Sequence, residues 1–540
     1  MPDAVVIGAG PNGLVAANHL ADAGWTVHVL EAEPTPGGAV RSAELTEPGF
    51  IHDVFSAFYP LAAASPAITT LELERWGLRW RHGPLVLAHP SAAEGTCVAL
   101  SRDLDETAAS LDVFAGGDGD SWRRLVRLFE RTSPHLLRGM TTALPPVRAA
   151  AGLAAELRGD LPRFLRMGLL GVRRLAEEEF RGTGAARLLA GNALHADLSP
   201  ELPPGGFYGW FLTALGQTVG YPFPEGGAQR LTDALVARLR SRGGELTCDA
   251  PVERVLVRRG RAVAVRTADG TVVEARRAVL ADTMPGALYE RLLEPEHVPA
   301  RVRRDLRRHQ LDAGTVKLDW ALDGPIPWRN EEARRAPVVH VADSVDELTQ
   351  STAELARGLV PATPFLVLGQ YALGGAGDPT RCPEGKEVAW AYTHVPQSIR
   401  GDAAGELTGT WEDAEVRRLV ERMEARVEAL APGFGRLVRA RHVLTPRDLE
   451  ERNANLVNGA LNGGTAQLHQ QLVLRPTPGL GRPDTPVDGL YLASAAAHPG
   501  GGVHGGPGVI AARAALHANR AKRVGLLVGA ATALAVRRRS

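Results

Sequence analysis

The chain has 540 residues, 44% of them hydrophobic, which is enough apolar material for more than one buried core. Lys plus Arg and Asp plus Glu both number 61, and this formal net charge of zero argues against a nucleic-acid partner. The three cysteines, Cys97, Cys248 and Cys382, lie far apart without a C-x-x-C pair, which argues against a dithiol redox centre and a zinc site.

The N-terminal stretch predicts a strand, a glycine turn, a helix and a second strand. Apolar residues 4–7 suit a buried parallel strand, and Gly8, Gly10 and Gly13 follow it with the G-x-G-x-x-G spacing of a dinucleotide-binding turn. Gly8 permits the tight turn, Gly10 lets the backbone approach a pyrophosphate, and Gly13 lets the helix pack closely on the strand. The expected helix extends to about residue 23.

The residues around this turn indicate which groups of a dinucleotide contact the protein. Pro11 and Asn12 begin the helix beside the pyrophosphate, and the second strand ends at Glu31 and Ala32. A carboxylate at Glu31 accepts hydrogen bonds from both ribose hydroxyls and disfavours a 2′-phosphate. This unit alone therefore predicts FAD or NAD.

A second glycine motif follows the second strand and favours FAD. Gly37 and Gly38, followed by Arg41, can cradle the far side of a pyrophosphate that carries a flavin rather than a nicotinamide. An ordinary surface turn is the alternative interpretation. Because no second strand-linked G-x-G-x-x-G occurs, we expect no separate nicotinamide domain, and dioxygen or a quinone-like molecule is the expected electron acceptor.

The next part of the chain is predicted to be helical, because apolar residues recur at helical spacing between positions 122 and 129. Residues 161–175 contain arginines and no acid, and on a helical wheel these arginines lie opposite an apolar stripe. The arginines are Arg163, Arg166, Arg173 and Arg174. Such a helix suits an anionic membrane surface, and a solvated face over a core-facing stripe is the alternative, with about equal weight.

Three stretches together resemble the superfamily of flavin amine oxidases and phytoene desaturases. They are the N-terminal fingerprint with its glycine pair and arginine, residues 221–285, and residues 488–516. Residues 221–285 are similar to the family's glycine pair, helix and β-meander, and the resemblance puts Val252 where the family's backbone meets the adenine. "HPGGGVHGGPG", beginning at His498, most resembles the carotenoid desaturase and retinol saturase branch, which includes relatives named for a pyridine nucleotide-disulfide domain.

The resemblance implies that the loop after His498 contacts the flavin. The implied binding residues are Ser494, Gly502, Val503, Gly506 and Gly508. Residues 505–508 are expected to begin a helix whose N-terminal amides and dipole face the reduced ring. Ser494 stands where the family usually has glycine and Ala39 where it often has arginine; neither departure removes the expected fold.

Three side chains are candidates for catalysis. Residues 316–322 alternate as a strand, with Lys317 on the face opposite its neighbours. Because amine oxidases of the superfamily carry a strand lysine that reaches flavin N5 through water, the resemblance makes Lys317 a candidate; a solvent-facing lysine is the more frequent outcome. His498 and His504 flank the glycine loop, where they either border the substrate or serve as structural hydrogen-bonding residues.

The C-terminus carries an apolar stretch, residues 525–536, followed by three arginines. As a helix it reaches about 18 Å, too short to span a bilayer, so it either enters one leaflet or packs on the protein. The chain begins in a strand without a cationic leader, so secretion is not expected. The predicted location is cytoplasmic, with peripheral contact to the inner face of the membrane.

These motifs predict an α/β fold with a discontinuous, Rossmann-like FAD-binding domain that carries a helical insertion and an inserted α+β substrate domain. The expected FAD-domain parts are 1–62, 220–300 and 485–522, with the helical insertion at 63–219, the substrate domain at 301–484, and an apolar and basic tail at 523–540.

The predicted function is that of an oxidoreductase with non-covalently bound FAD. It desaturates, saturates or isomerises C–C bonds of an apolar, polyene or isoprenoid-like small molecule by hydride exchange with flavin N5. An amine oxidase is one alternative, favoured by Lys317 but without an evident aromatic cage. A flavin-binding scaffold is the other, since no acid/base pair is evident. No metal site is predicted.

Overall fold

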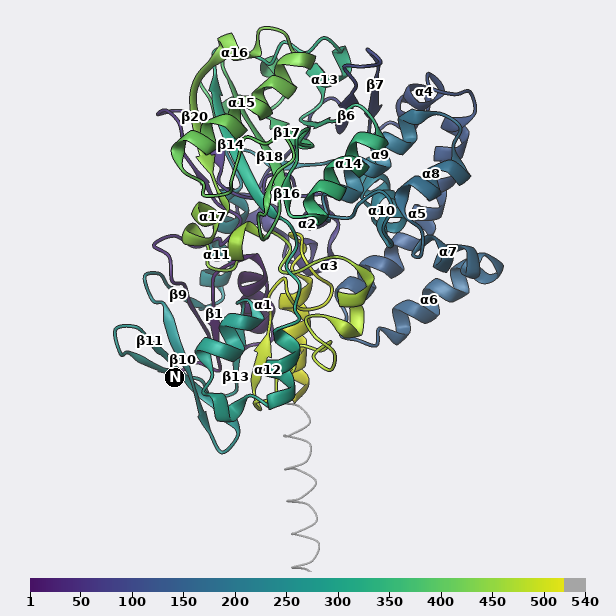
Figure 1. The fold of residues 1–540 in the computed structure, drawn as a ribbon. Coiled ribbons are helices and arrows are strands. Elements are labelled where there is room, and N and C mark those ends of the chain that lie inside the picture. Colours follow the sequence, from purple (N-terminus) through teal and green to yellow (C-terminus); the bar gives the residue numbers. More distant parts are fainter. Residues whose placement is uncertain (519–540) are drawn as a thin grey trace, which may run out of the picture.

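The protein is described here from a computed structural model, which covers residues 1–518 (Figure 1). A five-stranded parallel sheet forms one end of the molecule, with strand order β21-β13-β1-β2-β9. Its strands are β1 (Ala4–Ile7), β2 (Val27–Leu30), β9 (Glu245–Thr247), β13 (Ala278–Ala281) and β21 (Leu490–Leu492). They come from three distant parts of the chain, which confirms the predicted fold of a discontinuous Rossmann-like domain. The exact domain boundaries stay a prediction.

Different layers cover the two faces of this sheet. On one face pack α1 (Pro11–Asp22), α11 (Gln229–Ser241) and a helix over 506–518, around a core that includes Leu14 and Leu235. On the other face lies a three-stranded antiparallel sheet of β10 (Val252–Arg258), β11 (Arg261–Thr267) and β12 (Val272–Glu274). Burial on both faces explains why the central strands are continuous apolar runs.

A seven-stranded mixed sheet forms the second body, above the first in Figure 1. In spatial order its strands are β20 (Val438–Leu444), β14 (Gly314–Leu322), β18 (Glu387–Val395), β17 (Leu366–Gln370), β15 (Val338–Val341), β6 (Leu87–Pro90) and β7 (Cys97–Leu100). Strands β6 and β7 come from the first insertion, which was predicted to be helical. The two insertions therefore share one sheet.

Helices cover both faces of the seven-stranded sheet. One face packs on α15 (Asp413–Leu430), with Leu318 and Met423 in the shared core. Beside the other face lies a helical layer, the right-hand part of Figure 1. Its helices are α4 (Leu104–Asp112), α5 (Asp118–Met140), α6 (Val147–Leu157), α7 (Leu161–Met167), α8 (Val172–Glu179), α9 (Thr183–Leu194) and α10 (Gly205–Val219). The apolar positions predicted between 122 and 129 are buried in α5.

Shorter elements connect these layers. The helices are α2 (Pro60–Ala64), α3 (Pro66–Thr69), α12 (Ala300–Leu306), α13 (Glu331–Arg335), α14 (Val345–Ala356), α16 (Phe434–Leu437) and α17 (Pro446–Arg452). The strands are β3 (Ser42–Ala43), β4 (His52–Asp53), β5 (Trp80–Arg81), β8 (Phe223–Pro224), β16 (Leu359–Val360) and β19 (Gly401–Asp402).

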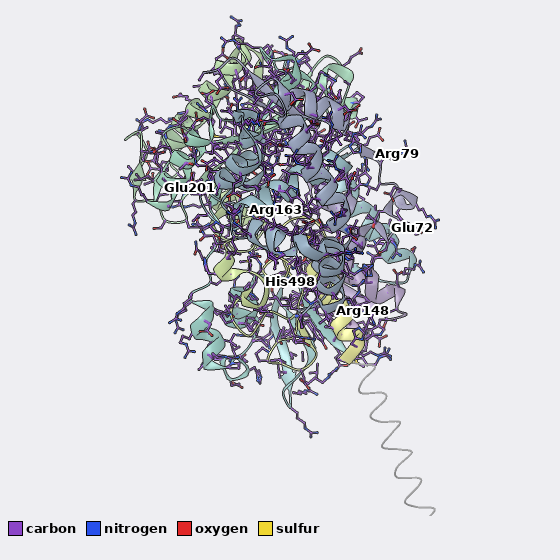
Figure 2. The ribbon with its side chains drawn as sticks, turned by 90° about the vertical axis from the view of Figure 1, so that its right-hand side faces the viewer. Glu72, Arg79, Arg148, Arg163, Glu201 and His498 are labelled. Carbon is purple, nitrogen blue, oxygen red and sulfur yellow. The ribbon has the colours of Figure 1, made fainter. Side chains whose placement is uncertain are left out.

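The prediction of a single basic helix over residues 161–175 is wrong. Helix α7 ends at Met167, and α8 begins only at Val172, after a break that contains Gly168 and Gly171. The arginines do not form a free cationic face, because acids later in the chain pair with each of them. The pairs are Arg163–Glu179, Arg166–Glu178, Arg173–Glu201 and Arg174–Glu178, with N···O distances of 2.6, 2.6, 2.7 and 2.9 Å. Figure 2 shows Arg163 and Glu201 on this layer.

Within residues 1–518, no helix is both long and apolar enough to cross a bilayer. The apolar stretch at 525–536 lies outside the described residues.

A fully buried ionic network joins the two bodies. The Arg381 guanidinium donates to both carboxylate oxygens of Asp53 on β4, at 2.9 and 3.2 Å, and neither side chain is exposed. Asp53 also accepts hydrogen bonds from the Tyr371 hydroxyl, at 2.5 Å, and from the backbone N–H of Ala228, at 2.7 Å. Because Ala228 immediately precedes α11, which packs on the five-stranded sheet, one carboxylate holds three separate chain segments together.

We expect Arg381→Met to destabilise the protein by about 3–5 kcal/mol, because it leaves the Asp53 carboxylate buried without a cation. The control is Arg439→Met, which removes partly exposed pairs with Asp323 and Glu47 and should cost about 1 kcal/mol or less. Urea unfolding followed by tryptophan fluorescence measures both. Equal effects of the two substitutions would contradict the prediction.

Candidate functional site

The candidate cofactor site lies at the carboxyl edge of the parallel sheet. Gly8 follows β1, Glu31 follows β2 and Asp282 follows β13. Gly13 brings α1 against this turn, because a Cβ at Gly13 would lie only 2.2 Å from the carbonyl oxygen of Gly8. Gly8 has φ +93°, a conformation that glycine adopts without strain. The predicted steric reasons for these two glycines therefore hold.

The side chains at this edge fit a bound adenine dinucleotide. The Glu31 carboxylate accepts hydrogen bonds from the backbone N–H of Ala9, at 2.6 Å, and of Glu33, at 3.0 Å. The side-chain oxygen of Asn12 is buried and has no hydrogen-bond partner within residues 1–518. In the first turn of α1, Pro11 has no N–H and the N–H of Gly13 donates to Asp282, so the N–H of Asn12 is the donor left without a partner within residues 1–518. An unpaired acceptor and an unpaired donor on Asn12, beside a fixed carboxylate, suit the predicted cofactor.

The second glycine motif packs directly on the first. The N–H of Gly37 donates to the carbonyl of Ala9, at 2.9 Å, and a Cβ at Gly38 would lie 2.9 Å from the Cα of Gly10. The Arg41 side chain donates to the carbonyl of Gly38, at 3.0 Å, and so braces this turn. The interpretation as an isolated surface turn is thereby excluded.

The predicted adenine contact lies beside the ribose acid. The N–H of Ala250 donates to the carbonyl of Glu31, at 2.8 Å, and Val252 begins β10 two residues later. Ala32 directly follows Glu31 in this turn. The two segments, 31–32 and 250–252, therefore meet where an adenosine would bind.

 Ala32 itself is exposed, so it offers a ligand only its backbone and its methyl group.

The C-terminal flavin loop ends at a helix N-terminus, as the resemblance implies. The helix begins at Gly506 and extends to residue 518, the last residue described. A Cβ at Gly508 would lie 2.1 Å from the carbonyl oxygen of Asn12, so only glycine lets this helix start so close to the start of α1. Two helix N-termini with their positive dipole ends therefore converge at one edge of the sheet.

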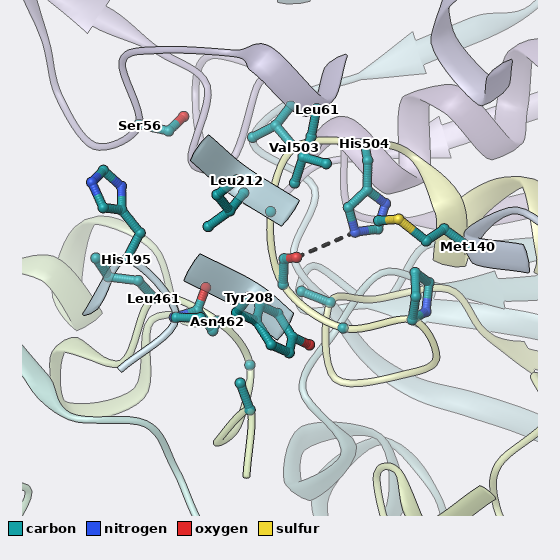
Figure 3. A pocket seen from close by; sticks show the side chains of 18 of the residues that line it. Ser56, Leu61, Met140, His195, Tyr208, Leu212, Leu461, Asn462, Val503 and His504 are labelled. Carbon is teal, nitrogen blue, oxygen red and sulfur yellow. Dashed lines mark hydrogen bonds between the residues drawn. The ribbon is translucent and has the colours of Figure 1, made fainter. Parts of the chain in front are cut away.

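The two loop histidines have different surroundings. His504 is buried, its Nδ1 accepts from the N–H of Gly506, at 2.9 Å, and its Nε2 donates to the carbonyl of Gly501, at 3.2 Å (Figure 3). Burial lowers the pKa of His504 to about 4, so the ring is neutral and braces its own loop. His498 lines the cavity, and its Nε2 lies 3.4 Å from the carbonyl of Gly139 on α5. A catalytic role for either residue stays a prediction.

A cavity of about 740 Å³ extends from the glycine turns to the seven-stranded sheet. Residues from the flavin turns, including Gly10 and Gly38, and from the C-terminal loop, including Ser494, Gly502 and Val503, form one end. Most of the remaining wall is apolar. It includes Phe55, Phe58, Leu61, Met140, Phe207, Tyr208, Phe211, Leu212, Val338, Val367, Trp390, Tyr392 and Leu461.

Lys317 belongs to this wall. The expected solvent-facing orientation is wrong, because the side chain is 3% exposed and lines the cavity from β14. Its ammonium group donates to Asp319, two residues along the same strand face, and Asp319 also lies 3.5 Å from Nδ1 of His52. Burial favours the neutral form of Asp319, but Lys317 and His52 outweigh it and hold its pKa below the usual range. Lys317 thus has a buried counter-ion.

Several residues of the site have only weak signals in the sequence. Asp282 directly follows an apolar strand, as Gly8 and Glu31 do, and this position marks it as a candidate. Trp390 and Tyr392 alternate along β18 and stack with ring centroids 6.0 Å apart. Arg475 is 1% exposed and donates to backbone carbonyls, including those of Asn462 and Ala495. No local pattern identifies Arg475, because its partners lie in separate turns.

No group of three or more His, Cys, Asp or Glu side chains in residues 1–518 is arranged to hold a metal ion. All three cysteines are free.

Comparison with known proteins connects this site to flavin chemistry. A family profile described as "FAD dependent oxidoreductase" matches residues 3–283. Mouse pyridine nucleotide-disulfide oxidoreductase domain-containing protein 2 is 28% identical over 549 residues, covering 94% of this chain and 92% of the relative. Hydroxyneurosporene desaturase of Cereibacter sphaeroides is 30% identical over 258 residues, covering 45% and 48%. The solved structure of wild-type putrescine oxidase bound to putrescine aligns with a TM-score of 0.58 at 17% identity, covering 96% and 99%, and so shows the shared fold.

The pH dependence of cofactor affinity tests the position of Asp282. Burial raises the pKa of Asp282 to about 7, against the lowering effect of the hydrogen bond that the Gly13 N–H donates to it. The carboxyl group is neutral below that pH and anionic above it. A Cβ at Gly10 would lie 2.8 Å from this carboxyl group, so the negative charge appears at the predicted pyrophosphate turn.

We expect the affinity of the apoprotein for FAD to fall as the pH rises from 6 to 9, by up to roughly tenfold. Quenching of FAD fluorescence on reconstitution measures it. Asp282→Asn keeps an acceptor for Gly13 and should flatten the pH profile, whereas an unchanged slope in this variant would assign the effect to another group.

Proposed function

We propose a substrate class for this chain, which belongs to the FAD dependent oxidoreductase family and binds FAD. The substrate is an apolar small molecule, polyene or isoprenoid-like, and the reaction desaturates, saturates or isomerises its C–C bonds. The observation that carries the proposal is the cavity of about 740 Å³, whose wall is mainly aliphatic and aromatic beyond the glycine turns. Burying an apolar ligand there contributes roughly 25 cal/mol for each Å² removed from water.

The charges around the cavity favour a neutral substrate. Asp282 is the one acidic side chain that lines it in residues 1–518, and it lies at the cofactor turn. Lys317 and Arg475 line it as cations. A protonated amine would meet these cations without an acidic partner of its own, whereas a hydrocarbon chain meets no such penalty.

When bound, FAD supplies the hydride acceptor or donor for this chemistry. The protein's own contribution is to orient the substrate and exclude water. Phe207, Phe211 and Leu212 on α10 form one side of the cavity, and Trp390 and Tyr392 on β18 form part of the other. An extended substrate held between these elements has its reactive carbons fixed relative to the glycine loop, which lowers the entropic part of the barrier.

The names of relatives support the same substrate class. One similar protein is a hydroxyneurosporene desaturase and another, from Cercospora nicotianae, is a phytoene desaturase. Each aligns with less than half of this chain, so the support concerns the chemistry and not the particular substrate.

An amine oxidase is the second candidate function. Two observations favour it: Lys317 is buried and lines the cavity, and Trp390 and Tyr392 form a near-parallel pair with an interplanar angle of 7°. This pair supplies an aromatic surface that is not evident from the composition, against which an amine substrate can pack. Within residues 1–518 no acidic side chain lines the cavity beside these rings, which argues for the apolar substrate instead.

For reoxidation we propose dioxygen or a quinone-like acceptor, because only one dinucleotide fingerprint occurs in the sequence. We also propose peripheral contact with a membrane through an apolar rim, defined as Val147, Leu165, Leu169, Leu468, Leu472 and Val473, all of which are exposed. Leu468 and Leu472 line the cavity, and Val147 and Leu169 adjoin the lining residues Pro146 and Gly168. The rim therefore provides a route for an apolar substrate from lipid into the cavity.

Anaerobic mixing of the holoprotein with candidate reductants tests the substrate class. We expect at least one isoprenoid hydrocarbon or alcohol to bleach the flavin, and putrescine, benzylamine and NADPH to bleach it poorly. The visible absorbance of the flavin is the readout, with substrate-free protein as the control. Fast, saturable bleaching by an amine would favour the amine oxidase, and bleaching by NADPH would reveal a nicotinamide site. If no compound bleaches the flavin, the hypothesis of a non-catalytic flavin-binding scaffold would remain.

Vesicle flotation tests the apolar rim. We expect Leu165→Ser combined with Leu169→Ser to reduce binding to phosphatidylcholine vesicles several-fold, since both side chains are more than half exposed. Anionic lipid should add little, because the nearby arginines are paired with acids. Val113→Ser removes an equally exposed residue at the end of α4 and is the control. Equal binding by all three proteins would rule out the rim.

A further inference from the structure

The end of the cavity next to α9 contains a hydrogen-bonded pair of histidines. His195 follows the last turn of α9 and lines the cavity, and its Nε2 lies 2.8 Å from Nε2 of His340 on β15. His340 is fully buried, in a space that exists because residue 191 on α9 is glycine: a Cβ there would lie 2.2 Å from Nδ1 of His340. The second histidine therefore fixes the orientation of the first.

Two polar atoms that line the cavity near this pair have no hydrogen-bond partner within residues 1–518. Nε2 of His195 is hydrogen-bonded to His340, so Nδ1 of His195 is the ring nitrogen left without a hydrogen bond. The hydroxyl group of Tyr392, on β18, also makes no hydrogen bond. Both side chains line the cavity and are partly accessible although they lie deep in the protein. Each can therefore pair with a ligand.

The register of the sheet puts these groups at one level. Tyr392 pairs with Val367, and Val367 pairs with His340, so the three residues cross β18, β17 and β15 in a single row. The ring centroids of His195 and His340 are 5.0 Å apart. His340, the partner of His195, and Tyr392 thus lie on either side of the apolar Val367, which lines the cavity.

Both groups are neutral at physiological pH. Burial, with a smaller contribution from His394, lowers the pKa of His195 to about 4. Burial also raises the pKa of Tyr392, with Asp197 and Tyr221 acting in the same direction. A neutral imidazole and a neutral phenol suit an uncharged oxygen function, since neither contributes a full charge.

We propose that this end of the cavity binds a hydroxyl or carbonyl oxygen on an otherwise apolar substrate, through Nδ1 of His195 and the hydroxyl of Tyr392. The proposal rests on the apolar substrate class proposed above and makes it more specific. Figure 3 shows His195 across the pocket from Val503 and His504, with Leu212 between them. The oxygen function is thereby held away from the glycine loop, and the hydrocarbon part lies between the two ends.

The matched ligands farnesol and farnesene test this selection, because they share an isoprenoid chain and differ in one hydroxyl group. A hydrocarbon leaves the two polar groups unpaired, whereas an alcohol pairs with at least one. We expect farnesol to bind the FAD-loaded protein roughly tenfold more tightly than farnesene. Ultrafiltration with gas chromatography of the free ligand gives both dissociation constants without relying on turnover.

Substitutions locate the contact. His195→Phe should bring the ratio of the two dissociation constants close to one, with little change in the dissociation constant of farnesene. Tyr392→Phe should reduce the preference for farnesol only in part. His195→Gln keeps a polar group and should retain part of this preference. His135→Phe changes a histidine that lines the cavity from α5 and should leave the ratio unchanged.

The outcomes separate this inference from the proposed function. Equal binding of the two ligands by the unsubstituted protein, or a ratio that responds to His135→Phe and not to His195→Phe, would overturn the inference and leave the apolar substrate class standing. If neither ligand binds, the apolar substrate class fails and this inference fails with it.

Discussion

Backbone contacts that only glycine allows shape the sheet edge at which we expect the cofactor to bind. The Cβ atoms that are missing at Gly13 and Gly508 would lie 2.2 and 2.1 Å from backbone oxygens, far inside van der Waals contact. Because glycine has no Cβ, α1 packs directly on the turn after β1, and the last described helix begins in contact with Asn12. The positive ends of two helix dipoles then meet at one sheet edge, where negative charge on a dinucleotide is stabilised.

The cavity exists because the two insertions share a sheet. Strands β6 and β7 extend the sheet of the second insertion, and α9 and α10 of the first insertion pack on that extension through a core that includes Leu87 and Leu189. The remaining part of the same face, at β14, β17 and β18, stays open toward the flavin turns and forms the cavity wall. The ionic network of Arg381 and Asp53 fixes this sheet to the flavin body, and through Tyr371 it reaches the indole N–H of Trp390 in the wall.

Local physics made part of this arrangement predictable. The N-terminal fingerprint, the glycine pair and the start of the final helix each depend on residues close in sequence, so their geometry follows from spacing. Lys317 shows the limit: its strand and its face could be predicted, but its burial depends on Asp319 and His52, and His52 is far away in the chain. The prediction of one basic helix over residues 161–175 failed for a related reason. The acids that pair with its arginines lie outside these residues, and Gly168 and Gly171 interrupt the helix.

The two cations that line the cavity are stabilised by groups of the protein itself, although few acids line the cavity. The charge of Lys317 is balanced by Asp319, and the guanidinium of Arg475 is surrounded by carbonyl dipoles, including those of Thr465 and Ala495. Each positive charge is therefore stabilised from behind the wall, and neither needs an anionic substrate to offset the cost of its burial. For the substrate class proposed above, selection would then depend on shape, on apolar area and on the few unpaired polar atoms that face the cavity. The proposed neutral, extended molecule would satisfy all three.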